Sequence, residues 1–451
     1  MVSSKTIHGA NKKRMLKYTF QPENPDYPRY MVASRLPRGG IDYYIKAEPL
    51  AWSTDGMPHA TCTEVVGKVN ECNYESIIAD KFNLMVRPKP KYDLQDTTIV
   101  FAPDYDAELM SIDPAGCRDI DDVLGWKRTD DYTEVSVHIA HVTQMDHPEF
   151  VHRQSTTIYP PTMSNYNLLP DVLAEGTLSL LPGIRRNVIS LIIRWEGDTM
   201  TERLQVRSIV NSRALTYEEA PDDIVYCKLK HWIEDYLFSE YISDSHEVVE
   251  RLMIYANVAV AKRLSATCPR NTVLRTTAPG LACPPALYML CSDCELLDRP
   301  TRHSYLDKEY YTHFTSPIRR AADQEVHLAL RRYVLNEEIE TASSTVLRSR
   351  LRTYNCRSAA VRRAEAEWFW LEAHKREECE FEAQVTNVQH GNIVELFLKK
   401  YEKRATVLWC CRRVLSAADS PECPWKPGDM CTVRLFWDTT MGLAGKTLQL
   451  V

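Results

Sequence analysis

Residues 111–124 read Ser111-Ile112-Asp113-Pro114-Ala115-Gly116-Cys117-Arg118-Asp119-Ile120-Asp121-Asp122-Val123-Leu124, and the rest of the chain is organised around them. Four aspartates fall within ten residues, and Pro, Gly and small side chains separate them, which suits a loop rather than a helix or strand. Carboxylates this close repel one another unless a positive group lies among them. Because oxygen ligands suit hard divalent cations, the stretch predicts a site for Mg²⁺.

Two other interpretations of this acidic stretch are open. An acidic loop is often a solvated surface turn, and for the stretch taken alone that interpretation is as good as a metal site. A calcium-binding loop fits poorly, because counting from Asp119 puts Val123 at the fifth ligand position and no glycine at the sixth. The metal interpretation therefore depends on a second stretch, two hundred residues further along the chain.

Composition limits the class of protein. The 451 residues, 44% hydrophobic and 26% charged, are typical of a globular protein with two to four domains. No apolar run approaches the roughly 18–20 residues that cross a bilayer, so no membrane partner is expected. Fourteen cysteines without an export signal indicate reduced thiols in an intracellular protein, cytoplasmic or nuclear, with a mitochondrial location as the alternative for its basic N-terminus.

Hydrophobic patterning divides the chain into four parts. Residues 1–25 are expected to be a basic tail, and the short β-branched and aromatic runs of 26–95 predict a small OB-like barrel. Residues 96–378 predict one α+β domain, with strands at 134–140 and 188–195 and an amphipathic helix over 248–264. It ends in a basic helix, 344–376, with eight Lys or Arg against three Glu. The short strands of 379–451 predict a second OB-like barrel that binds RNA.

The second informative stretch is Tyr311-Thr312-His313-Phe314-Thr315-Ser316-Pro317-Ile318-Arg319-Arg320. Thr315 or Ser316 can cap a helix, and Pro317 would then occupy its first position. A helix start that presents free backbone N–H groups together with two arginines attracts phosphate. The pattern therefore predicts a phosphate-binding helix end.

These two stretches together resemble the signatures of the RNase II/RNase R family of RNB-domain exoribonucleases, and most of all the branch that includes the hydrolytic nuclease of the eukaryotic exosome. Residues 113–122 match the family's catalytic loop at all four acidic positions, and 313–320 match its second signature nearly letter for letter. The resemblance covers residues 26–451. It implies an RNB catalytic domain between a cold-shock-like barrel and a ribosomal-protein-type RNA-binding barrel.

The resemblance also implies roles for individual residues. The Mg²⁺-binding carboxylates, for one or two ions that Mn²⁺ could replace, would be Asp113, Asp119, Asp121 and Asp122. The residues that act directly in cleavage would be Asp121, Asp122 and Arg319, with Asp121 the most critical and Arg319 bracing the scissile phosphate. The RNA-binding residues would be Tyr159, Tyr217, Glu250 and Arg320. Taken in isolation, the two tyrosines fit core positions better.

The function expected from the resemblance is Mg²⁺-dependent 3′→5′ hydrolysis of single-stranded RNA to nucleoside 5′-monophosphates, with other subunits of an RNA-processing complex as further partners. Two departures from the family leave alternatives open: Ala321 stands where the family usually has Tyr, and the segment 257–303 is short. The first alternative is a catalytically weak or inactive RNB-family RNA-binding subunit. The second is a protein-interaction module without affinity for RNA.

Overall fold

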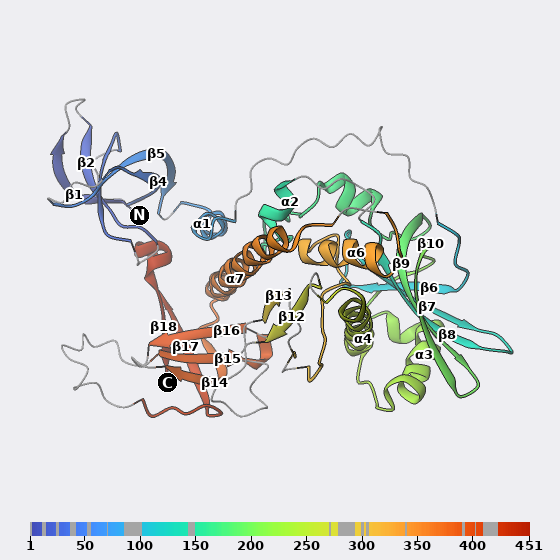
Figure 1. Cartoon of the computed structure of the whole chain (residues 1–451). Helices are drawn as coiled ribbons and strands as arrows, with labels where there is room; N and C mark the ends of the chain where they lie inside the picture. The colour runs from blue at the N-terminus through green and yellow to red at the C-terminus, as the bar shows by residue number, and fades with distance from the viewer. Residues whose placement is uncertain are drawn as a thin grey trace.

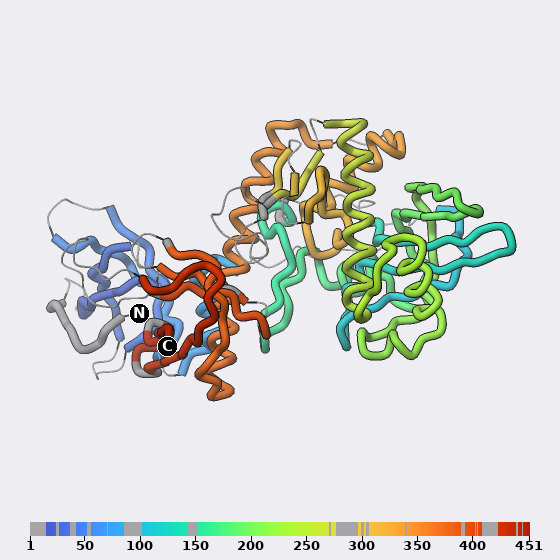
Figure 2. Tube along the Cα trace, turned by 90° about the horizontal axis from the view of Figure 1, so that it is seen from below, coloured from blue at the N-terminus to red at the C-terminus, as the bar shows by residue number. Residues whose placement is uncertain are grey.

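The structure is a computed structural model. It describes residues 2–10, 15–23, 27–36, 42–51, 56–69, 71–84, 102–142, 149–269, 272–277, 294–298, 302–303, 306–338, 341–389, 393–401, 403–408 and 423–451. Within these ranges, no helix is long and apolar enough to cross a membrane. The fold is α+β. The large domain, which is central in the sequence, lies on one side of the molecule, and two small β-barrels lie on the other, as Figures 1 and 2 show from two directions.

A six-stranded sheet forms the centre of the large domain, in the order β10-β9-β8-β7-β6-β11. Its strands are β6 (Glu108–Asp113), β7 (Asp122–Arg128), β8 (Thr133–Ala140), β9 (Arg185–Glu196), β10 (Thr199–Val210) and β11 (Ala214–Thr216). Neighbours pair antiparallel except β11, which runs parallel to β6. The two predicted strands are confirmed as β8 and β9, and every residue of β8 is buried.

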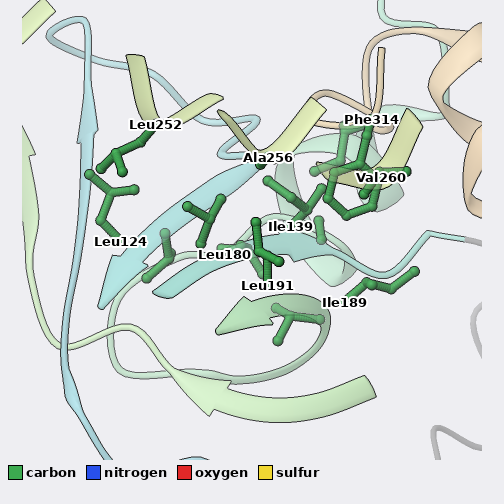
Figure 3. Close-up of a cluster of buried hydrophobic side chains, with 14 of the residues drawn as sticks. Leu124, Ile139, Leu180, Ile189, Leu191, Leu252, Ala256, Val260 and Phe314 are labelled. Carbon is green, nitrogen blue, oxygen red and sulfur yellow. The ribbon is translucent and has the colours of Figure 1, made fainter. Parts of the chain in front are cut away.

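Helices pack against this sheet. The predicted amphipathic helix is α4 (Ser245–Thr267), and its Leu252, Ala256 and Val260 lie over Ile139 and Leu191 of the sheet (Figure 3). Fully burying a leucine, isoleucine or valine side chain contributes about 1.5–3 kcal/mol. The remaining elements of the domain are α2 (Glu149–Gln154), η2 (Leu173–Thr177), η3 (Ala220–Asp222), α3 (Ile224–Trp232), η4 (Ile233–Phe238), β12 (Leu274–Thr277), β13 (Cys294–Leu297) and α6 (Ala321–Tyr333).

The N-terminal barrel is closed, with strands in the order β1-β2-β3-β5-β4. They are β1 (Val2–Ala10), β2 (Leu16–Phe20), β3 (Tyr30–Ser34), β4 (Tyr43–Pro49) and β5 (His59–Lys68). The barrel is confirmed, but the prediction that residues 1–25 form a tail is wrong. Strand β1 closes the barrel between β2 and β4, and Tyr18 of β2 is fully buried, so pairing and burial outweigh the basic composition of this segment.

The C-terminal strands form a second, nearly closed barrel, which confirms the prediction of an OB-like module there. The order is β16-β15-β14-β17-β18, and the outer strands β16 and β18 approach each other. The elements are β14 (Glu380–Gln389), β15 (Ile393–Leu398), η6 (Lys399–Tyr401), β16 (Lys403–Leu408), β17 (Met430–Trp437), η8 (Thr439–Gly445) and β18 (Lys446–Leu450). Sequence patterning did not anticipate β18.

One long helix, α7 (Ser344–Lys375), joins the three parts. Six apolar side chains of this helix are buried: Leu347, Leu351, Tyr354, Val361, Trp368 and Leu371. Trp368 packs in one cluster with Tyr44 of the N-terminal barrel and Ile78 of α1 (Tyr74–Lys81). Residues 85–101, where we expect the boundary at 95/96, lie outside the described residues, and the domain limits stay predictions.

Candidate active site

The acidic stretch lies at the ends of two neighbouring strands. Asp113 is the last residue of β6 and Asp122 the first of β7, so two of the four aspartates belong to strands and not to a loop as expected. A turn closed by the Cys117 N–H and the Pro114 carbonyl (3.1 Å) follows β6, and it uses the positive φ of Gly116 (80°). The sheet therefore holds the first and last carboxylates, and the loop carries the middle two.

Backbone hydrogen bonds anchor the loop that carries Asp119 and Asp121. The Ile120 N–H donates to Ser179 Oγ (3.0 Å), the Leu180 N–H donates to the Ile120 carbonyl (3.0 Å), and the Ile120 side chain is buried. The Asp121 carbonyl accepts from the Ala140 N–H at the end of β8 (2.8 Å). Residues on either side of Asp121 are thus tied to the domain core.

Asp121 connects the acidic loop to the second signature. Its side chain is 3% exposed, Oδ1 accepts from the Ile318 N–H (2.8 Å), and Oδ2 lies 3.3 Å from Arg319 Nε. Asp119 is engaged differently, because its Oδ2 accepts from the Tyr159 hydroxyl (2.7 Å). Asp119 is therefore paired with a neutral group, and Asp121 with a cation.

Burial is the main influence on the pKa values of Asp113, Asp121 and Asp122. It raises the pKa of Asp113 to about 6, with the nearby Asp119 adding to the rise. It raises the pKa of Asp122 to about 7, with Asp113 adding to the rise and Arg319 and Arg320 opposing it. Burial also raises the pKa of Asp121 well above its usual range, against the opposing charge of Arg319. Ionising these groups together is unfavourable unless a further positive charge joins them.

The donor set fits a hard divalent cation. All four groups offer carboxylate oxygens, and Asp113 Oδ2 is buried without a hydrogen-bond partner. Among the residues that the structure describes, no three His, Cys, Asp or Glu side chains already converge as a metal centre. Tyr159 and Arg319 occupy oxygens of Asp119 and Asp121 that a cation would use.

The second signature does not form the expected helix start. Helix α6 begins at Ala321, and Pro317 lies in a turn before it. Tertiary contacts occupy the backbone donors: the Ile318 N–H binds Asp121, the Ala321 N–H binds the Ser155 carbonyl (2.9 Å), and the Ser316 N–H binds Asp323 Oδ1 (2.8 Å). The prediction of free N–H groups that bind phosphate is therefore wrong at these three positions, and the arginine side chains remain.

The two arginines differ in their availability. The side chain of Arg319 is 46% exposed and also donates to Ser316 Oγ (3.1 Å). Arg320 donates to Asp323 Oδ1 (2.8 Å), and Asp323 is fully buried. Both arginines line the same cavity as the aspartates, but Arg319 is the freer of the two.

Both aromatic candidates line the cavity, so a core position is the wrong interpretation for Tyr159, whereas Tyr217 also packs, partly buried, against the core of the domain. Tyr159 is 40% exposed. Tyr217 stacks on His246 with ring centroids 3.6 Å apart and planes 12° from parallel. Glu250 of α4 faces the same space. One cavity of about 760 Å³ is lined by all nine candidates: Asp113, Asp119, Asp121, Asp122, Tyr159, Tyr217, Glu250, Arg319 and Arg320.

Sequence reasoning did not place at the active site several further residues that line this cavity. Arg275 of β12 donates to His313 Nε2 (2.6 Å), and burial together with Arg320 and Arg275 lowers the pKa of His313 well below its usual range, which keeps it neutral. Arg362 of α7 and Lys403 of β16 reach the cavity from the long helix and the C-terminal barrel. The basic composition of 344–376 signalled Arg362 in outline, whereas nothing in the spacing around Arg275 pointed to the cleft.

Comparisons with known proteins agree with this architecture. The RNB domain family matches residues 104–235. The exosome complex exonuclease RRP44 of Homo sapiens is 28% identical over 320 residues, which cover 49% of this chain and 33% of the relative. The chain thus spans about a third of the length of that relative.

Solved structures share the fold. Mycoplasma genitalium RNase R in complex with ribose-methylated single-stranded RNA superposes with a TM-score of 0.65 at 14% identity, covering 100% of both chains. Yeast Ssd1, a pseudonuclease, superposes with a TM-score of 0.66 at 14% identity, covering 87% of this chain and 63% of Ssd1. Sequence match and fold lead to one conclusion: residues 104–235 carry an RNB domain, and the chain as a whole shares the fold of RNase R.

Proposed function

We propose that the protein is a Mg²⁺-dependent exoribonuclease that hydrolyses single-stranded RNA in the 3′→5′ direction and releases nucleoside 5′-monophosphates. One observation carries the proposal: Arg319 lies 3.3 Å from Asp121 although 198 positions separate them, and both line a cavity with three further aspartates. Carboxylates and a half-exposed guanidinium in one cleft suit a phosphodiester better than a neutral substrate.

Asp113, Asp119, Asp121 and Asp122 would hold one or two Mg²⁺ ions, or Mn²⁺ in their place. Bound divalent cations supply a water molecule of lowered pKa and offset charge on the leaving oxygen. Arg319 would donate to the scissile phosphate and offset its growing charge. Tyr159 would stack on bases without reading their identity, which suits sequence-tolerant digestion.

Single-stranded RNA is the proposed partner. The solved structure of Mycoplasma genitalium RNase R contains single-stranded RNA, and its fold is shared by this chain. Arg362 and Lys403 line the cavity from α7 and β16, so they would meet the RNA backbone where it enters. Because the human relative is named as part of an exosome complex, other subunits of an RNA-processing complex are further proposed partners.

A catalytically inactive RNA-binding subunit is the second candidate. The likeness to Ssd1, a pseudonuclease, favours it, and so does Ala321 at the start of α6. The four aspartates favour the enzyme, because clustered buried carboxylates beside RNA phosphates weaken binding unless cations are present.

A nuclease assay separates the two candidates. Purified protein is incubated with 5′-labelled single-stranded RNA and Mg²⁺, beside Asp121→Asn and the control Asp131→Asn, which changes an exposed aspartate in the hairpin between β7 and β8. We expect a ladder ending in short oligomers for the wild type and Asp131→Asn, and none with Asp121→Asn or EDTA; chromatography of the unlabelled products identifies the nucleoside 5′-monophosphates. Tight binding without shortening of the RNA would establish the RNA-binding subunit instead.

A further inference from the structure

Tyr159 lies on a loop that is tied to both halves of the cleft. We call residues 158–166 the tyrosine loop; Ile158 and Tyr166 exchange backbone hydrogen bonds of 3.1 and 2.9 Å that close it. Just before it, the Thr157 N–H donates to the Arg319 carbonyl (2.8 Å). The Tyr159 hydroxyl then reaches Asp119 on the acidic loop. The placement of this tyrosine is therefore linked to both signatures.

The tip of the tyrosine loop is held from outside the catalytic domain, by Glu75 of α1. The Thr162 N–H donates to Glu75 Oε2 (3.2 Å), and Thr162 Oγ1 donates to Glu75 Oε1 (2.6 Å). Lys375 Nζ at the end of α7 also donates to Oε1 (3.3 Å). Trp368 Nε1 binds the Glu75 carbonyl (3.1 Å), so this short helix is fastened to α7 as well.

Glu75 is buried almost completely, with 1% exposure. An unpaired carboxylate there would be strongly unfavourable, but hydrogen bonds from Thr162 and Lys375 compensate it. Although burial alone would raise the pKa of Glu75, these bonds hold the pKa below its usual value, so the group stays ionised at neutral pH. Thr162 itself is exposed, as are most residues at the tip, so the bonds to Glu75 fix a segment that burial does not.

The connection from Thr162 back to Tyr159 is short and stiff. Only Pro160 and Pro161 lie between them, and each proline ring holds its φ near a single value. Only ψ can still rotate at these two residues, so they absorb little of a shift of Thr162. It is passed on to Tyr159, whose exposed ring faces the cavity.

We propose that Glu75 is a positioning residue for Tyr159: acting through Thr162, it lets α1 and α7 set where the aromatic ring meets the terminal base of the RNA. This inference rests on the proposed role of Tyr159 in RNA binding. Under this inference α1, the helix that follows the N-terminal barrel, helps to position an RNA-binding residue of the cleft through the buried carboxylate of Glu75.

The test removes the side-chain part of the link, the hydrogen bond from Thr162 Oγ1 to Glu75 Oε1. Thr162→Val is nearly isosteric and changes an exposed residue, and Ser164→Ala on the same loop is the matched control. Glu75→Gln removes the negative charge. If both substitutions act through one contact, the double variant with Thr162→Val should bind RNA no more weakly than the single variant with the lower affinity. Thermal unfolding of each variant shows whether the fold is retained.

Two readouts are compared, and the first needs no cleavage. RNA carrying 2-aminopurine at its 3′ end is bound in EDTA, where stacking on Tyr159 quenches fluorescence. We expect Thr162→Val to reduce the quench and raise Kd about threefold, less than the roughly tenfold loss expected when the Tyr159 ring itself is removed, with Ser164→Ala unchanged. In the nuclease assay, KM should rise by the same factor, with kcat within about twofold.

An unchanged quench and Kd in Thr162→Val would overturn the positioning role, whether or not the wild type cleaves RNA. A wild type that binds but never shortens RNA would overturn the proposed nuclease, while a reduced quench in Thr162→Val would still support the link. A lower melting temperature in Glu75→Gln with normal binding in Thr162→Val would assign Glu75 to stability alone and would overturn the inference.

Discussion

The acidic loop and the arginine loop meet in one cleft but are built in different ways. Strand ends and buried backbone bonds hold the aspartates, and Asp121 is 3% exposed. The arginine loop, residues 313–320, lies ahead of α6 and is tied to the acidic side by the bond from the Ile318 N–H to Asp121, and to the segment before Tyr159 by the bond from the Thr157 N–H to the Arg319 carbonyl. Arg319, at its end, stays 46% exposed.

This difference separates two kinds of charge. The acidic side keeps its carboxylates buried, where their ionisation is unfavourable. This suits groups that ionise when they bind a cation, because the cation compensates their negative charge. The arginine side keeps one cation beside solvent, which suits a group that meets an incoming phosphate. Asp121 belongs to both sides, because it is one of the buried carboxylates and also holds the loop that carries Arg319.

The largest effect is expected at Asp121. Asp121→Asn keeps an oxygen for the Ile318 N–H but removes the charge, so kcat should fall about a thousandfold. Asp119→Asn, whose partner is the neutral Tyr159, should lose less, about a hundredfold. Single-turnover cleavage of labelled RNA measures both. Equal losses of kcat in the two variants would contradict the distinction between Asp121, which contacts the arginine loop, and Asp119, which does not.

On the arginine side, Arg319→Ala should lower kcat about a hundredfold with a smaller change in KM, because charge is offset mainly in the transition state. Arg319→Lys should recover only part of this, since an ammonium lacks the planar donor pair. Steady-state kinetics are compared with Arg352→Ala, an exposed arginine of α7. A change confined to KM would assign Arg319 to ground-state binding.

Tyr159 is an uncharged side chain of the cleft, and its hydroxyl contacts the acidic loop at Asp119. Tyr159→Ala should weaken RNA binding about tenfold, as expected for losing one stacked base. Tyr159→Phe keeps the ring and removes only the bond to Asp119, so its affinity should stay within about twofold of the wild type. Binding titrations with catalysis blocked by EDTA distinguish the two. Equal losses would mean that the hydroxyl, and not the ring, contributes the affinity.

The smallest effect concerns stability and pH. The pKa values of Asp113 and Asp122 are about 6 and about 7 in the folded chain, above the ordinary value of 3.8. Between these limits the folded state binds more protons than the unfolded state, so stability without metal should fall as pH rises from about 4 to about 7. Mg²⁺ should therefore raise the melting temperature more at pH 8 than at pH 5.

Thermal unfolding in EDTA and in Mg²⁺ at the two pH values measures this effect. Asp122→Asn is the control, because removing the carboxyl should flatten the decline in stability with pH. A melting temperature in EDTA that rises over the same pH range would contradict the raised pKa values, and with them the contrast between the two loops.

Sequence reasoning succeeded where the signal was local. The periodicity of 248–264 and the alternation of 134–140 predicted α4 and β8, because burying one face imposes a repeat on the residues. It failed where a tertiary bond overrode a local preference. Pro317 suits a helix start, yet the neighbouring N–H groups bind Asp121 and Asp323 and delay the helix to Ala321.

The contrast between local sequence signals and tertiary contacts also explains why the first two strands were not predicted. A basic composition suggested a tail, but β1 is needed to complete the ring of hydrogen bonds between β2 and β4. Neither charge nor propensity in that segment reports the partner that a strand will find. Arg275 was missed for a similar reason, since only the fold brings β12 to the cleft.

The sequence by itself determined the chemical groups at the cleft and the elements that carry them, because side-chain identity and short-range spacing are written along the chain. Only the tertiary structure decided which groups meet. The Asp121–Arg319 pair joins residues 198 positions apart, and Glu75 reaches Thr162 across 87 positions. Such contacts depend on how the sheet, α7 and the barrels pack, and burial then sets the charge and direction of each group.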